Sequence, residues 1–155
     1  MAHSNIGSHP SFGYTKVVSL SSAEQLGSGD SGKLFMVDQS SAFTVNLPKL
    51  STDIAGWQAR FVIKTADTNA VHIMAWGLTN TGGTGDSGAT NDGDTVILKE
   101  MATTDAGAAT ASSQDGVFFH SDAGVGDSID IFTDGTSWYA TSFVADAAHS
   151  DDVDG

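Results

Sequence analysis

The chain has 155 residues, with 19 Asp and Glu against 6 Lys and Arg, and therefore a formal net charge of −13 at neutral pH. A chain of this length folds as one domain with a sizeable core, and the absence of Cys excludes disulfides and thiolate metal sites. So few cations also argue against nucleic acid or an anionic membrane as a partner, because both are bound through clustered Lys and Arg.

Residues 1–15 are expected to form an extended N-terminal arm, because they show neither a helical nor a strand period. Their large apolar side chains are Ile6, Phe12 and Tyr14. Two interpretations stand side by side: a floppy terminus, or a segment that orders against a neighbouring subunit with Phe12 and Tyr14 as anchors. No leader-like apolar run and no stretch of membrane-spanning length is visible, so we expect a soluble protein made in a cytoplasm.

From residue 16 to residue 145 the sequence predicts an all-β domain. Short runs rich in Val, Ile, Phe, Thr and Trp alternate with turn residues, and helical periodicity is nearly absent. The expected strands are residues 33–38, 42–47, 57–64, 71–76, 95–98, 116–120, 127–132 and 137–144. Short connections predict hairpins between the first two, the next two and the last two of these strands. We therefore expect a single small antiparallel β-sandwich, jelly roll or barrel-like domain.

The last of these hairpins has the most specific turn. Its sequence, Thr133-Asp134-Gly135-Thr136, contains an Asp-Gly pair, which suits the positive φ angles of a tight hairpin turn. In the strand at 57–64, Trp57, Phe61 and Ile63 recur at every second or fourth position, and we expect them to face the core.

Three other stretches are less regular. Residues 77–94 consist mostly of Gly, Thr, Asn, Asp and Ser, and loops of that length are usually functional or disordered. Residues 101–115 are compatible with a short helix or with another loop. Residues 146–155 are expected to form an acidic C-terminal tail that is solvated and mobile.

Candidate metal ligands are sparse. Asp86, Asn91, Asp92 and Asp94 offer hard oxygen atoms, yet their spacing does not match a calcium-binding repeat, and solvated loop acids explain them better. The histidines lack the spacing of a preformed metal site, and His72 is expected on the solvent-facing side of its strand. We expect neither a metal nor a cofactor.

Recognisable catalytic motifs are also missing from the sequence. Residues 27–33 have the Gly and Lys spacing of a phosphate-binding loop, but Leu34 stands where that loop needs Ser or Thr, so an ordinary turn into a strand is the better interpretation. No Cys nucleophile and no nucleophile elbow is present. A carboxylate pair assembled across strands stays open, but we assign no catalytic residue and expect a protein that is not an enzyme.

A sugar-binding platform of Trp57, Trp76 and Trp138 would need at least two exposed rings on one face. Trp57 is in phase with core positions. Trp76, close to Leu78 and the long loop, is the ring that we expect to be exposed, and these two residues are the candidate loop contact.

Four segments then occur in a characteristic order. They are Ser31 to Asp38, Phe43-Thr44-Val45-Asn46-Leu47-Pro48, Ala55-Gly56-Trp57 followed by Arg60-Phe61-Val62-Ile63-Lys64, and Gly126 to Tyr139 with its Asp134-Gly135 turn. This series, which spans roughly residues 30 to 140, resembles small β-rich structural proteins of tailed bacteriophages, including capsid decoration or cement proteins and modules of tail fibres.

The resemblance implies a non-enzymatic virion protein that binds the outer surface of an assembled phage head and stabilises it. The implied partners are the major capsid protein and further copies of the chain, typically as trimers. In such a protein Ile6, Phe12 and Tyr14 would contact the capsid or a neighbouring subunit, and the arm would order only on the shell. Two alternatives remain: a tail-fibre or head-fibre component that binds host glycans, and a free carbohydrate-binding module.

Overall fold

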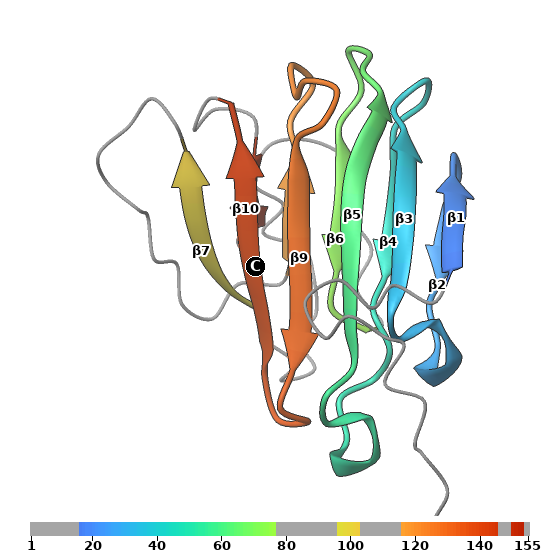
Figure 1. The fold of residues 1–155 in the computed structure, drawn as a ribbon, viewed down its shortest axis with the longest axis vertical. Helices are drawn as coiled ribbons and strands as arrows, with labels where there is room; N and C mark the ends of the chain where they lie inside the picture. Colours follow the sequence, from blue (N-terminus) through green and yellow to red (C-terminus); the bar gives the residue numbers. More distant parts are fainter. Residues whose placement is uncertain (1–15, 77–95, 103–115, 146–149, 154–155) are drawn as a thin grey trace, which may run out of the picture.

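The computed structural model of the protein describes residues 16–76, 96–102, 116–145 and 150–153. Within these ranges the chain is all-β, as expected, and its strands form two sheets. Sheet A contains, in order across the sheet, β1 (Lys16–Leu20), β3 (Lys33–Asp38), β5 (Gln58–Thr65), β9 (Ser128–Thr133), β10 (Trp138–Val144) and β7 (Val96–Ala102). Sheet B contains β11 (Ser150–Val153), β8 (Gly116–Phe119), β6 (Val71–Met74), β4 (Phe43–Asn46) and β2 (Glu24–Gln25). Figure 1 shows sheet A in front, with β6 and β4 of sheet B behind it.

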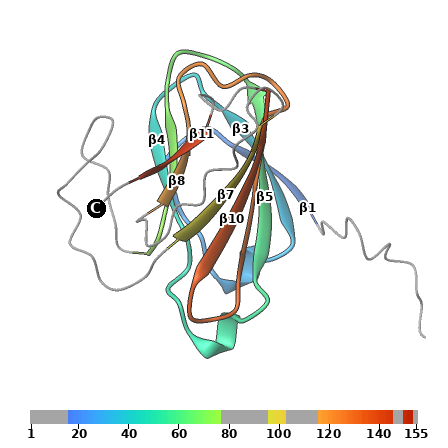
Figure 2. The same ribbon diagram turned by 90° about the vertical axis from the view of Figure 1, so that its left-hand side faces the viewer.

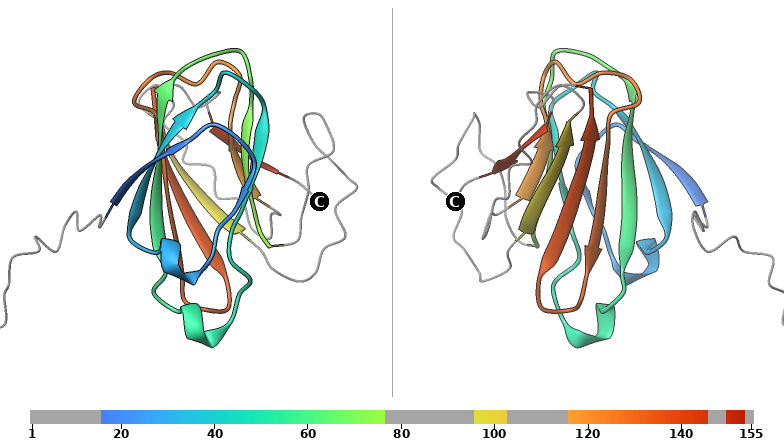
Figure 3. Two further views of the ribbon diagram at one scale, coloured as in Figure 1. Left: turned by 90° about the vertical axis from the view of Figure 1, so that its right-hand side faces the viewer. Right: turned by 60° about the vertical axis from the view of Figure 1, so that its left-hand side comes forward.

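The two sheets form two layers with the core between them. Figure 2 shows the layers from one edge, and the left view of Figure 3 shows them from the opposite edge. Among the described strands, β1 and β7 of sheet A and β11 and β2 of sheet B pair on one side only. The sheets therefore do not close, and the barrel-like alternative is wrong.

The first six strands alternate between the two sheets. The chain passes from β1 in sheet A to β2 in sheet B, and repeats this crossing with β3 and β4 and again with β5 and β6. As a result β1, β3 and β5 run parallel to one another, as do β2, β4 and β6. The expected hairpins between 33–38 and 42–47 and between 57–64 and 71–76 are therefore wrong, and so is a purely antiparallel sheet.

The crossing from β3 to β4 shows why a short connection need not make a hairpin. Gln39, directly after β3, is fully buried, and its backbone N–H donates to the carbonyl of Thr65 at the end of β5. Its side-chain amide donates to the carbonyl of His120, and Asn69 donates to the carbonyl of Gln39. These bonds turn the chain at Gln39 from one layer to the other, a choice that loop length alone does not reveal.

The closing hairpin is confirmed. Strands β9 and β10 are antiparallel neighbours, with Thr133 opposite Trp138. Gly135 has a φ of 94°, and a Cβ at this position would lie 2.9 Å from the carbonyl oxygen of Ser51. Both observations require glycine, since other residues rarely adopt this φ. The Asp134 carboxylate accepts hydrogen bonds from the backbone N–H groups of Thr136 and Ser137, which fixes the turn.

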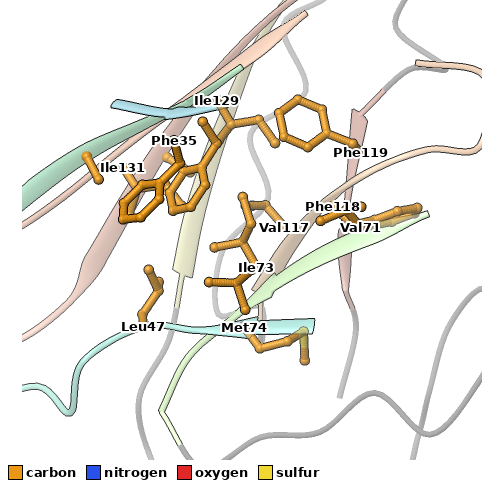
Figure 4. Packing of buried hydrophobic residues seen from close by; sticks show 14 of the residues in the cluster. Phe35, Leu47, Val71, Ile73, Met74, Val117, Phe118, Phe119, Ile129 and Ile131 are labelled. Carbon is orange, nitrogen blue, oxygen red and sulfur yellow. The ribbon is translucent and has the colours of Figure 1, made fainter. Parts of the chain in front are cut away.

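The core lies between the sheets and contains alternate residues of several strands, such as Phe35 and Val37 of β3. Phe35 and Phe61 stack across β3 and β5 with ring centroids 4.9 Å apart, and Trp57 meets Trp138 edge to face at 5.2 Å. Figure 4 shows Phe35, Ile129 and Ile131 of sheet A facing residues of sheet B such as Ile73 and Val117. The expected inward positions of 57–64, namely Trp57, Phe61 and Ile63, are all buried.

The domain limits expected from the sequence can be compared with the structure at the two ends of the chain. The arm expected at residues 1–15 lies outside the described residues. Strand β11 falls within the range 146–155 that was expected to be an acidic tail, and it pairs with β8 so that Asp151 lies opposite Phe118. Four residues of that acidic range thus belong to sheet B.

Candidate functional site

The outward side of sheet A, here called face A, carries large apolar side chains. On β3, Phe35 and Val37 point into the core, so the half-buried Leu34 and Met36 between them point outward. The register carries this outward parity across the sheet, from Val17 on β1 through Leu34 to Arg60 on β5. Face A contains the apolar and aromatic residues Val17, Leu34, Met36, Val62, Phe132, Tyr139 and Phe143, the ion pair Arg60–Asp130, and the polar residues Ser19, Gln58, Lys64 and Thr141.

Face A also holds most of the solvent-exposed large apolar side chains of the described residues. Val17 is 63% exposed, Phe132 48% and Phe143 41%. The other two exposed side chains of this kind, Val125 and Trp76, lie outside sheet A. Exposed apolar side chains that share one face of a sheet are typical of a surface that binds another molecule.

The aromatic residues of face A are held in place by their neighbours. Phe132 on β9 stacks on Tyr139 of β10, with ring centroids 5.2 Å apart. The hydroxyl of Tyr139 donates to the Asp134 carboxylate at 3.1 Å, and this bond raises the pKa of Tyr139. The rings are therefore positioned by the closing hairpin before any partner arrives.

An ion pair stands in the middle of face A. Arg60 of β5 donates through Nε and Nη2 to both carboxylate oxygens of Asp130, which lies directly opposite it on β9. The guanidinium group lies 5.8 Å from the ring centroid of Phe143, within range of a cation–π contact. The pair neutralises both charges and leaves the centre of face A close to neutral.

Most of the cations of the chain lie on strands of sheet A. Five of its six Lys and Arg residues lie on strands of this sheet, together with three acidic residues, whereas the strands of sheet B contain three acidic residues and no Lys or Arg. The five cations are Lys16, Lys33, Arg60, Lys64 and Lys99. Sheet A is thus the less acidic layer of a strongly acidic protein.

Face A was not predicted from the sequence, although a signal was present. The run Leu34-Phe35-Met36-Val37 is continuously apolar, and such a run indicates a strand that is covered on both sides. Strict alternation, as in Phe43-Thr44-Val45-Asn46, indicates a strand with one solvated side. The contrast between these two strands indicates an apolar outer side on β3 that β4 does not have.

The tryptophans occupy different environments. Trp57 and Trp138 are buried, and the indole N–H of Trp57 donates to the carbonyl of Gly27 at 3.0 Å. Trp76 is 37% exposed, as expected, and Lys49 Nζ lies 4.8 Å from its ring centroid. A platform of these three rings is not formed, because two of them are in the core. Leu78, the second candidate loop contact, lies outside the described residues.

His72 is on the outer side of sheet B, between the buried Val71 and Ile73, as predicted, but it is half-buried and not fully solvated. Its ring stacks on Phe118 at 5.0 Å, and the ring of Phe118 in turn lies 5.8 Å from that of His120. Burial lowers the pKa of His72. In the part of the chain that the structure describes, no three His, Cys, Asp or Glu residues are grouped so as to hold a metal ion.

The run at 27–33 is an ordinary turn into a strand, as interpreted. Residues Ser28–Asp30 form a short 3-10 helix, and Lys33 opens β3. Asp30 accepts from the backbone N–H of Gly27 and forms an ion pair with Lys33. The lysine that a phosphate-binding loop would direct to its ligand is used within the turn.

The remaining predicted site residues lie outside the described residues. They are the arm residues Ile6, Phe12 and Tyr14 and the candidate calcium ligands Asp86, Asn91, Asp92 and Asp94. Over the described ranges, no helix has the length and apolar character needed to cross a bilayer. Comparison of the chain with protein-family models, with curated proteins and with solved structures finds no match.

Proposed function

We propose that this chain is a non-enzymatic structural protein of a tailed-phage particle, of the decoration or cement type, which binds the outer surface of the assembled head and stabilises it. The observation that carries the proposal is face A, a broad sheet surface with Val17, Phe132 and Phe143 exposed around the Arg60–Asp130 ion pair. Such a surface suits protein docking, in which aromatic and Arg side chains supply most of the binding energy.

The resemblance of the sequence to phage virion proteins is the reason for proposing a phage particle as the site of action. The fold supports the proposal because it provides a rigid scaffold for a docking surface. We take the two layers as a sandwich-type scaffold that holds face A on one side, with the arm of residues 1–15 preceding its edge strand β1. In this proposal the arm contacts the major capsid protein through Ile6, Phe12 and Tyr14, and the assembled chain is a homotrimer. A protein that binds the assembled shell and not its dissociated subunits stabilises the shell by mass action.

A second candidate, a fibre component or carbohydrate-binding module that binds glycans, is favoured by one observation. Trp76 presents an exposed indole ring, the type of surface on which sugars stack. Lys49 lies over this ring, so a sugar would have to use its other side or displace the lysine. Quenching of the tryptophan fluorescence by added glycans, lost in Trp76→Ala, would favour this candidate over decoration.

The deciding experiment is quantitative mass spectrometry of purified virus particles from the source system. We expect a copy number equal to that of the major capsid protein, or a simple fraction of it. A handful of copies per particle would assign the protein to a tail or a unique vertex, and its absence from particles would refute the viral role. Heads that lack the protein should then take it up from solution and resist heat or dilution better.

A further inference from the structure

We infer that the occupant of face A is a second copy of this chain, so that face A is the surface through which copies associate. The inference rests on the proposed use of face A as a protein-docking surface and names its partner. It leaves the capsid contact to another part of the molecule.

The dimensions of face A fit such an interface. Six strands spaced about 4.8 Å apart and about 20 Å long give a plane of roughly 600 Å². The accessible area of side chains on such a plane is larger than the plane itself, and it approaches the ~800 Å² per partner of a specific interface. Two copies meeting through face A would cover Val17, Phe132 and Phe143, which are otherwise left in water.

The charge of the chain points to a second copy as the occupant. Two chains of charge −13 repel each other, and they approach most easily through the surfaces that carry least negative charge. The strands of sheet A hold five of the six Lys and Arg residues, of which Arg60 and Lys64 lie on face A, whereas Lys16 and Lys33 have the inward parity of Phe35. Sheet B, whose strands hold acidic residues and no Lys or Arg, would face away from the partner.

The central ion pair disfavours a strongly acidic foreign partner. The guanidinium of Arg60 is already engaged by both oxygens of Asp130, so it offers little charge to a carboxylate from outside. A surface that is close to neutral, partly apolar and of equal breadth complements face A better. Face A of a second copy is such a surface. Contact of face A with face A is isologous, which is the arrangement of a two-fold dimer, the commonest soluble homo-oligomer.

Salt separates this mode of association from one that is driven by opposite charges. Added salt screens the repulsion between the acidic copies and leaves the burial of apolar surface in place. We therefore expect the association to strengthen with salt, whereas docking of an acidic partner on the cations of sheet A would weaken.

The test is sedimentation equilibrium of the full chain, whose monomer mass is 15.9 kDa, at low and high salt. We expect a dimer in free solution that salt strengthens. Phe132→Glu and, separately, Val17→Glu on the edge strand should each weaken association about tenfold or more. Val125→Glu is the matched control, because it adds the same charge at a 71% exposed apolar residue outside sheet A. Fluorescence of the buried Trp57 and Trp138 reports whether each variant is folded.

A chain that stays monomeric at all concentrations and at both salt levels would overturn the inference. Equal weakening by Val125→Glu and by the face A variants would overturn it as well. These failures are distinct from failure of the proposed function. If the chain is a monomer that saturates phage heads, and Phe132→Glu abolishes this binding, the decoration role is retained and the capsid is the partner of face A. An oligomer that depends on face A but is absent from particles would retain the inference and refute the viral role.

Discussion

Replacing Gly116 with Ala places a methyl group where strands β8 and β6 leave no room for one. A Cβ at Gly116 would lie 2.5 Å from the carbonyl oxygen of Ile73 and 2.7 Å from the sulfur of Met74. The Met74 side chain has freedom to move, but the Ile73 carbonyl belongs to the backbone of β6, which pairs with β8 at this point. One of the two strands must therefore shift.

The expected loss of stability is about 1–2 kcal/mol. Overpacking of this kind costs about 1–3 kcal/mol, and the reduced freedom of the unfolded chain after Gly→Ala returns about 0.4–1 kcal/mol. Gly116 is not among the glycines with positive φ, so backbone strain adds nothing to the steric effect. For a chain of this size the loss corresponds to a fall in Tm of about 2–8 °C.

Urea unfolding followed by tryptophan fluorescence measures this loss, since Trp57 and Trp138 are buried. The matched control is Gly29→Ala, because a Cβ at Gly29 would meet nothing within 4 Å and its φ is not positive. We expect the control to be as stable as the parent chain or slightly more so. If Gly116→Ala proved as stable as Gly29→Ala, the close approach of β6 and β8 would be refuted.

Three further predictions concern ionisable groups. Asp127 is buried and accepts from the backbone N–H groups of Gly124 at 2.8 Å and Ala145 at 3.1 Å, so Asp127→Ala should cost about 1.5–3 kcal/mol in urea unfolding; a change no larger than that of an exposed-loop variant would contradict this role. The N–H and hydroxyl of Thr136 hold the pKa of Asp134 at about 2. The stability that ionised Asp134 contributes to the fold is therefore fully present above the ordinary pKa of 3.8 and is lost as the pH falls through 2. Asp134→Ala should flatten the acid limb of a Tm-against-pH curve in that window, and an unchanged limb would count against it. Burial lowers the pKa of His72, so the stability of the fold should fall as the pH drops below 6.5, where the unfolded chain binds the proton first. His72→Gln should remove this pH dependence of Tm. If the dependence persists in the variant, another group causes it.

The strands themselves were largely predictable from the sequence. A short apolar run located the strand at 33–38 with the bounds that the structure has, and side-chain alternation placed Trp57, Phe61 and Ile63 in the core. The Asp134-Gly135 turn identified the closing hairpin because a positive φ restricts the choice of residue.

The pairing of the strands was not predictable from the same signals. A strand with one buried side looks the same whether its chain neighbour pairs beside it or lies across the core. For β3 and β4 the choice depends on Gln39, whose hydrogen bonds reach Thr65 and His120, far along the chain. Strands β1, β2 and β11 were missed because they are short and contain polar residues. Face A could not be predicted before the pairing order was known, since its residues come from different strands.

The alternation of β1 to β6 between the layers also has a kinetic consequence. Except for β9 and β10, the paired residues of neighbouring described strands are at least 17 positions apart, the smallest separation being that of Lys16 and Lys33. In the closing hairpin, Thr133 and Trp138 are separated by only a short turn. Contacts between distant parts of a chain slow folding, because the loop between them must close before the contact forms. The hairpin is therefore the natural nucleus of this protein, and the parallel strands are expected to assemble on it late and together.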